Sequence, residues 1–122
     1  MSCENSILGT VKSLMPGSIA WEDDTSFDAD LIAYINTTLS ILNHEGIGKK
    51  NFKITGFSET WDQFIPKELY ENEEVYYETL NMVPTYVRFK VKTMFDPATS
   101  GTLKQTEDET LKELEWRLYS LA

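Results

Sequence analysis

The sequence predicts an all-α (mainly α) fold: a small helical bundle of about four principal helices, with a long extended loop between the second helix and a C-terminal αα-hairpin. Three observations support this prediction. Apolar residues recur at spacings of three and four in four separate stretches. Proline and glycine fall between those stretches, where helices usually end. Strand-like alternation of apolar and polar residues is confined to the short segment 52–55.

The N-terminal half contains two predicted helices. The first lies near residues 4–14 and ends before Pro16. The second lies near residues 28–45, where we expect Asp28 to cap the N-terminus and Gly46 to end the helix. The apolar stripe of the first helix is Ile7, Leu8, Val11 and Leu14, and that of the second is Leu31, Ile32, Ile35, Leu39 and Leu42.

The middle of the chain predicts little regular structure. Residues 47–60 are expected to form an exposed loop. One helical turn follows, with Thr60 as its N-cap, and Trp61 and Phe64 are expected to pack inward. Residues 67–80 are acidic and rich in tyrosine, and their weak periodicity predicts no element.

The last third predicts the αα-hairpin, with arms near residues 82–95 and 103–120. We expect Asn81 to cap the first arm, because this places Pro84 in the first turn, where a missing N–H costs nothing. Pro97 disfavours the α region for the residue before it, so the first arm should end near Asp96.

The second arm of the hairpin has its own start signal. Thr102 and Gln105 have the spacing of a capping box. Its inward stripe is Leu103, Leu111, Leu114, Leu118 and Leu121. Together with the other stripes, this predicts a core that includes Leu31, Ile35, Leu39, Val87, Val91, Leu111, Leu114 and Leu118.

Each arm also carries aromatic residues away from its predicted inward face. At 100° per residue, Phe89 lies about 160° from Val91, and Trp116 lies about as far from Leu114. Tyr119 is one turn beyond Trp116. Trp and Tyr are enriched at protein interfaces, so we interpret Phe89, Trp116 and Tyr119 as a subunit contact. Scattered surface aromatics are the alternative.

Composition limits the function classes. The 122 residues predict one helical domain over residues 1–122. The only cysteine is Cys3, so no intramolecular disulfide is possible and a reducing compartment is expected. No stretch approaches the ~18 apolar residues of a membrane span, so we expect no membrane partner.

The charge of the chain argues against nucleic-acid binding. Its 20 acidic and 11 basic side chains give a net charge of −9, which repels phosphate. The one small basic cluster, Lys49, Lys50 and Lys53, supplies too few contacts for DNA. We interpret this loop, together with Phe52 and Ile54, as a docking site for an acidic partner surface.

The sequence contains no recognisable catalytic signature. With a single histidine, His44, and a single cysteine, one chain cannot form an ordinary zinc site. The short glycine pair Gly46 and Gly48 lacks the rest of a dinucleotide fingerprint. We therefore expect no enzyme activity and no catalytic, cofactor or metal site.

The order of elements resembles the head-tail connector (adaptor, or head completion) proteins of tailed bacteriophages. The specific part of the likeness lies in residues 54–64 and 87–118. The resemblance implies a structural virion protein that forms a ring, usually of twelve copies, beneath the portal protein. That ring would extend the DNA channel and join the head to a tail or head-closure protein, while DNA passes through without specific binding.

The resemblance also implies a location and a contact. The protein would lie at the head–tail interface of the virion, and in the host cytoplasm during assembly. The sequence ends almost directly after the last predicted helix, so we expect the portal or neighbour contact at residues 47–60 rather than in a long tail. The resemblance does not say whether acidic segments such as residues 67–80 face the channel.

Two other function classes remain open from the residues alone. The first is a small acidic regulator or nucleic-acid mimic that binds a basic protein site, which a strictly monomeric chain would favour. The second is an enzyme that uses carboxylates in a helical cleft, which would require two acids converging in an apolar pocket.

Overall fold

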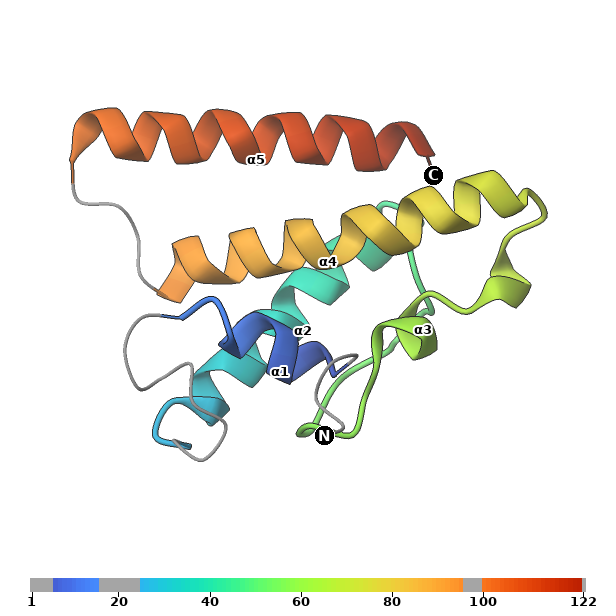
Figure 1. Ribbon diagram of the computed structural model, residues 1–122, viewed down its shortest axis with the longest axis horizontal. Helices are drawn as coiled ribbons and strands as arrows, with labels where there is room; N and C mark the ends of the chain where they lie inside the picture. Colours follow the sequence, from blue (N-terminus) through green and yellow to red (C-terminus); the bar gives the residue numbers. More distant parts are fainter. Residues whose placement is uncertain (1–5, 16–24, 96–99, 122) are drawn as a thin grey trace.

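The computed structural model describes residues 6–15, 25–95 and 100–121 (Figure 1). Its elements are α1 (Ile7–Lys12), α2 (Asp28–His44), α3 (Trp61–Phe64), the 3-10 turn η2 (Lys67–Leu69), α4 (Glu73–Phe95) and α5 (Gly101–Leu121). Over these residues there is no strand, and an isolated bridge joins Ser6 to Thr60. The predicted all-α fold is confirmed. The expected helix stop at residues 96–97 lies outside the described residues.

Helix α4 is the centre of the molecule. It packs against α1, α2 and α3 on one side and against α5 on the other (Figure 1). α5 runs antiparallel to α4 and packs mainly against it. The predicted αα-hairpin is therefore confirmed, with α4 shared between the hairpin and the rest of the bundle.

Most of the predicted core is confirmed. Leu31, Ile35, Leu39, Val87, Val91 and Leu118 are fully buried, and Leu111 is 9 % exposed. The prediction that Leu114 belongs to the core is wrong, because its side chain on α5 is only half-buried. Leu103 was expected on the same inward stripe, but it is 60 % exposed at the start of α5. None of the helices in the described ranges is both long and apolar enough to cross a membrane.

The start of α4 differs from the prediction. The helix begins at Glu73 rather than near residue 82. Asn72 caps it, because its side-chain oxygen accepts hydrogen bonds from the backbone N–H groups of Glu74, at 2.9 Å, and Val75, at 3.2 Å. Pro84 consequently lies inside the helix, where it removes one backbone hydrogen bond.

Burial explains why α4 continues through its proline. The residues buried along α4 on both sides of Pro84 are Tyr76, Thr79, Val83, Tyr86, Val87 and Val91. The packing of this face stabilises the helix by more than the lost bond costs, since tertiary contacts routinely override local propensity. Asn81, the predicted cap, is an exposed residue inside the helix.

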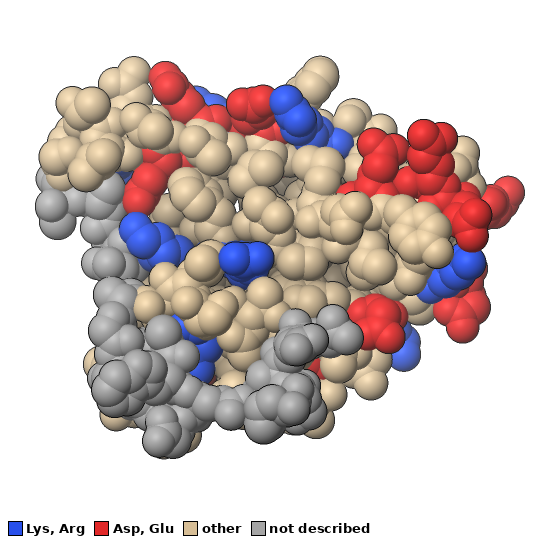
Figure 2. All heavy atoms as spheres, viewed as in Figure 1, with Lys and Arg blue, Asp and Glu red and all other residues tan. Residues whose placement is uncertain are grey.

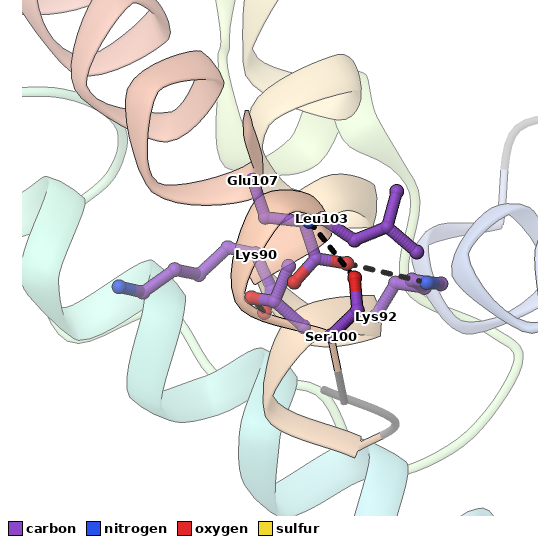
Figure 3. Close-up of polar contacts among 6 residues, drawn as sticks. Lys90, Lys92, Ser100, Leu103 and Glu107 are labelled. Carbon is purple, nitrogen blue, oxygen red and sulfur yellow. Dashed lines mark hydrogen bonds and ion pairs between the residues drawn. The ribbon is translucent and has the colours of Figure 1, made fainter. Parts of the chain in front are cut away.

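The starts of α2 and α5 also correct the sequence prediction. Asp28 is the first residue of α2 and not its cap; its carboxylate instead accepts a 2.8 Å contact from Nζ of the buried Lys12. In α5 the predicted Thr102–Gln105 capping box is absent, and Gln105 donates to Glu109 at 3.3 Å. Ser100 takes the capping role, because its Oγ accepts from the backbone N–H of Leu103 at 3.1 Å (Figure 3).

Two other boundary signals are confirmed. The Gln63 side chain accepts a 3.1 Å hydrogen bond from the Thr60 backbone, as in a capping box, and the turn buries Trp61 and Phe64. Gly46 follows the end of α2 with φ = +87°, the left-handed conformation of a helix C-terminal stop.

Candidate interaction surfaces

The long loop between α2 and α3 is fastened to α2 by two asparagine side chains. Asn36 donates to the carbonyl of Ile54 at 3.1 Å and accepts from its N–H at 2.8 Å. Asn43 donates to the carbonyl of Ile47 at 2.9 Å and accepts from the N–H of Asn51 at 3.1 Å. Ile47 and Ile54 are both 2 % exposed. The loop is therefore irregular in backbone but anchored at two points, unlike a simple exposed loop.

Gly48 fixes the loop against α3. Its φ of +83° favours glycine, and a Cβ at this position would overlap the ring of Phe64. The next residue, Lys49, donates its N–H to the Phe64 carbonyl at 2.8 Å. The close approach of the Gly48 backbone to the Phe64 ring thus sets the start of the lysine-bearing segment.

The predicted docking residues divide into anchors and exposed groups. Lys49, Lys50 and Lys53 are exposed. Phe52 is half-buried, with its ring centroid 5.5 Å from that of Phe64, and Ile54 is buried. The sequence prediction grouped all five, but only the three lysines are exposed.

A pocket of about 420 Å³ lies between the exposed side of α2 and this loop. Its lining residues are Asn36, Ser40, Asn43, His44, Lys50, Asn51, Phe52 and Lys53. The lining contains cationic and amide groups and no carboxylate. Such a pocket favours an anionic group from a partner. Sequence reasoning found its lysines but missed Asn36 and Asn43, which are polar positions inside a helical pattern.

The two arms of the hairpin are joined by polar contacts. The hydroxyl of the fully buried Tyr86 donates to Oε2 of Glu115 at 2.9 Å. Burial and the neighbouring Glu115 carboxylate raise the pKa of Tyr86 well above its usual value. Nearer the turn, Lys92 pairs with Glu107 at 3.5 Å, while Lys90 extends to the other side of α4 (Figure 3).

The predicted subunit-contact residues lie in different environments. Trp116 is 72 % exposed on α5. Phe89 is half-buried and packs against the core, so it is not on a free face of α4. Tyr119 is also half-buried, and burial raises the pKa of its hydroxyl. Trp116 is thus the most exposed of the three predicted contact residues.

A groove of about 350 Å³ separates part of α4 from α5. Its lining residues are Asn81, Met82, Thr85, Thr110, Glu113, Leu114 and Arg117. Glu113 and Arg117 pair with each other at 2.8 Å, four residues apart on α5. The half-burial of Leu114 follows from its place in the wall of this groove.

Acidic side chains gather at one end of the molecule. In Figure 2 they cover the right-hand end, which is where the first turns of α4 lie in Figure 1. Glu71, Glu73, Glu74 and Glu78 are exposed there. Basic side chains appear on the same face of the molecule over the C-terminal half of α4 (Figure 2). This face therefore carries an acidic cluster at the start of α4, with some basic groups beside it.

A model of the family described as "Phage connector protein" matches residues 7–121. The chain belongs to this family. The match runs from the start of α1 to the end of α5, so it includes the loop and the hairpin as well as the core. Membership establishes a structural connector role in a phage particle and confirms the family resemblance. No curated protein and no solved structure matches the chain.

The described residues of this connector offer no obvious metal site. No three His, Cys, Asp or Glu side chains among them are grouped as metal ligands. The expectation that the chain has no enzyme activity and no cofactor stays a prediction.

Proposed function

We propose that the chain forms a ring, of about twelve copies in the virion, beneath the portal protein, where it extends the DNA channel and joins head to tail. The family match over residues 7–121 carries this proposal. A ring built from one kind of subunit needs head-to-tail contacts, so each copy must present two different complementary surfaces.

The exposed indole of Trp116 supports one of these surfaces. A tryptophan that is 72 % exposed leaves a large apolar area in water, and such residues are enriched among the energetic anchors of interfaces. We assign Trp116 to the subunit contact. Tyr119, three residues further along α5, and Phe89, which packs against the core from α4, are half-buried and would support the hairpin behind this contact. Phe89 is therefore assigned to the contact as a residue that stabilises the hairpin, not as one that touches the neighbouring subunit directly.

The lysine loop supports a second contact. Lys49, Lys50 and Lys53 are exposed on a backbone that Asn36 and Asn43 hold in place. A fixed backbone lowers the entropy lost on docking. We assign this loop to contact with the portal or with a neighbouring copy, and leave the tail or head-closure protein to the opposite side of the ring.

The negative charge of the chain fits a channel through which DNA passes. A net charge of −9 opposes the counterion release that makes DNA binding favourable. DNA would therefore slide past the ring without specific binding. The protein would assemble in the host cytoplasm and remain at the head–tail interface.

Labelling of virions tests the proposal. In phage particles that carry this chain, gold-labelled antibody should bind at the head–tail joint, and particles made without the chain should separate into heads and tails. A label on the capsid shell or the tail tip would contradict the proposal. So would joined, infectious particles in the absence of the chain.

A further inference from the structure

The first turns of α4 form an acidic projection. Tyr86 pairs with Glu115 and Lys92 with Glu107, so this antiparallel register places the end of α5 beside about residue 80 of α4. The turns of α4 before that point extend past α5, as Figure 1 shows. They carry Glu74 and Glu78, both exposed and four residues apart.

These carboxylates are not neutralised within the described part of the chain. Glu73 pairs with Lys67 at 3.0 Å, but no ion pair is formed by Glu74 or Glu78, or by Glu71 just before the helix. Glu74 lies in the first turn, where the helix dipole favours a carboxylate. Glu71 and Glu78 lie outside that turn, so the dipole does not account for the whole acidic surface.

The lysine loop is the matching surface of opposite charge. Over residues 6–15, 25–95 and 100–121, Lys49, Lys50 and Lys53 form no ion pair. Lys50 and Lys53 line the 420 Å³ pocket together with His44, and the lining contains no acid. The pocket is open to solvent and its wall is held by the Asn36 and Asn43 hydrogen bonds.

We propose that the acidic projection of one copy, Glu71, Glu74 and Glu78, docks against the lysine loop and pocket of a second copy. Charge complementarity favours this occupant, because each copy carries one surface of each sign, and among the described residues neither the three carboxylates nor the three lysines form an ion pair. Because the two surfaces are different, the same contact can repeat head-to-tail from copy to copy around a ring. The inference rests on the proposed ring and specifies one of its joints.

DNA is an alternative anionic partner that could bind these lysines instead of the acidic projection of a second copy. Three lysines release few counterions, and the remaining net charge of the chain repels a phosphate backbone. A short acidic helix end presents fewer charges at a defined spacing, which suits a pocket with two lysines in its lining. The second copy is therefore the better occupant.

A charge-exchange experiment tests the joint. One variant carries Lys50→Glu and Lys53→Glu, and the other carries Glu74→Lys and Glu78→Lys. In each variant alone, the two docking surfaces have the same sign. In an equimolar mixture, every contact between unlike variants is again complementary, so assembly should return with the two variants alternating.

Sedimentation velocity at low salt measures the outcome. We expect the wild-type chain to self-associate, each variant alone to associate about tenfold more weakly or worse, and the mixture to regain association near the wild-type level. Raising the salt from about 20 to 500 mM should weaken the wild-type contact, because the Debye length falls several-fold.

Matched controls separate this joint from a general effect of net charge. Lys104→Glu with Thr102→Glu and Gln105→Glu, and Asp62→Lys with Asp108→Lys, change the charge by the same amounts at other exposed positions. These controls should keep wild-type association, and circular dichroism should show all variants to be helical. Loss of association in the controls as well would overturn the joint.

The remaining outcomes show whether the proposal of the charged joint fails alone or together with the proposal of the ring. If the wild-type chain associates, and both the lysine-to-glutamate and the glutamate-to-lysine variants associate equally well, the charged joint is wrong. The proposed ring is not affected by that result. If the wild-type chain stays monomeric at low salt and high concentration, the charged joint is also wrong, and the ring is then judged by virion labelling. If the lysine variant instead loses binding to a short DNA duplex that the wild type retains, DNA is the occupant.

Discussion

The two sides of α4 differ in how firmly they are packed. On one side, α2 buries five of its 17 residues against the core, and its asparagines also hold the following loop. On the other side, α5 is longer, with 21 residues, yet buries only Leu111 and Leu118. Helix length therefore does not measure how strongly an element is attached.

This difference separates a structural region from a region available to partners. The α1–α4 region holds most of the buried apolar area, and that burial supplies most of the folding free energy. α5 is attached by two buried leucines, by half-buried side chains such as Leu114 and Tyr119, and by a few polar contacts, and most of its other side chains are exposed.

Replacing one buried leucine by alanine on each side of α4 gives the largest expected effects and tests whether the two sides are packed differently. We expect Leu39→Ala to lower the free energy of unfolding by about 2 to 5 kcal/mol and to weaken the whole fold. Leu118→Ala should remove a similar apolar volume but chiefly release α5. Denaturant unfolding with hydrogen exchange measures both, and the Leu118→Ala chain should keep its α2 protection. Equal loss of protection in α2 would show one cooperative unit.

Gly48→Ala tests the anchored loop. A Cβ requires both a left-handed backbone and movement of the Phe64 ring, so the combined cost should be about 2 to 4 kcal/mol. Gly46→Ala is the control, because it has the same backbone conformation but nothing within 4 Å of its Cβ. Thermal unfolding should place Gly46→Ala between Gly48→Ala and the wild type. Equal stability of the two variants would rule out the Phe64 contact as the cause.

Asn36→Ala tests the attachment of the loop to α2. It leaves the N–H and carbonyl of Ile54 without their partner, which should cost about 1 to 3 kcal/mol. Asn43→Ala removes a more exposed pair of bonds and should cost less. Chemical denaturation compares the two variants. A larger loss at Asn43 would mean that the loop is held mainly from its other end.

Tyr86→Phe tests the polar tie between α4 and α5. Loss of the hydrogen bond to Glu115 should cost about 1 kcal/mol at neutral pH. Because the folded state raises the pKa of Tyr86, its contribution is fully present below pH 10 and is lost as the pH rises above that value. The wild type should therefore lose stability above pH 10 more steeply than the Phe variant. Parallel pH curves would contradict this account.

Trp116→Glu should have the smallest effect on folding and a large effect on assembly. The side chain is 72 % exposed, so the change in unfolding free energy should stay below about 0.5 kcal/mol. Light scattering should show loss of assembly while circular dichroism stays helical. Lys104→Glu, also exposed on α5 but about three turns before Trp116, is the matched control and should assemble normally. Unchanged assembly of Trp116→Glu would make the indole an idle surface group.

The sequence predicted the elements better than their ends. The periodic stripes of α2 and the hairpin arms identified Leu31, Ile35, Val87 and Leu118 as core, because burial of one helix face leaves a readable pattern. The start of α4 was wrong, because residues 73–81 read as acidic and weakly periodic. Their helical state depends on the burial of Tyr76 and Thr79 in the folded chain, which a local pattern does not contain.

The candidate surfaces were only partly predictable. Exposed lysines and the exposed Trp116 could be found from charge and helical angle. Phe89 was placed on a free face because the angular argument used one inward direction, whereas α4 is packed on opposite sides. The projection of Glu74 and Glu78 beyond α5 depends on the register of the hairpin, which the Tyr86–Glu115 contact sets.

The mass of the wild-type chain with and without purified portal rings tests the connector account most directly. Native mass spectrometry should detect a closed assembly of about twelve copies added to each portal ring, whatever the state of the free chain. A chain that stays monomeric and never joins the portal ring would contradict the account.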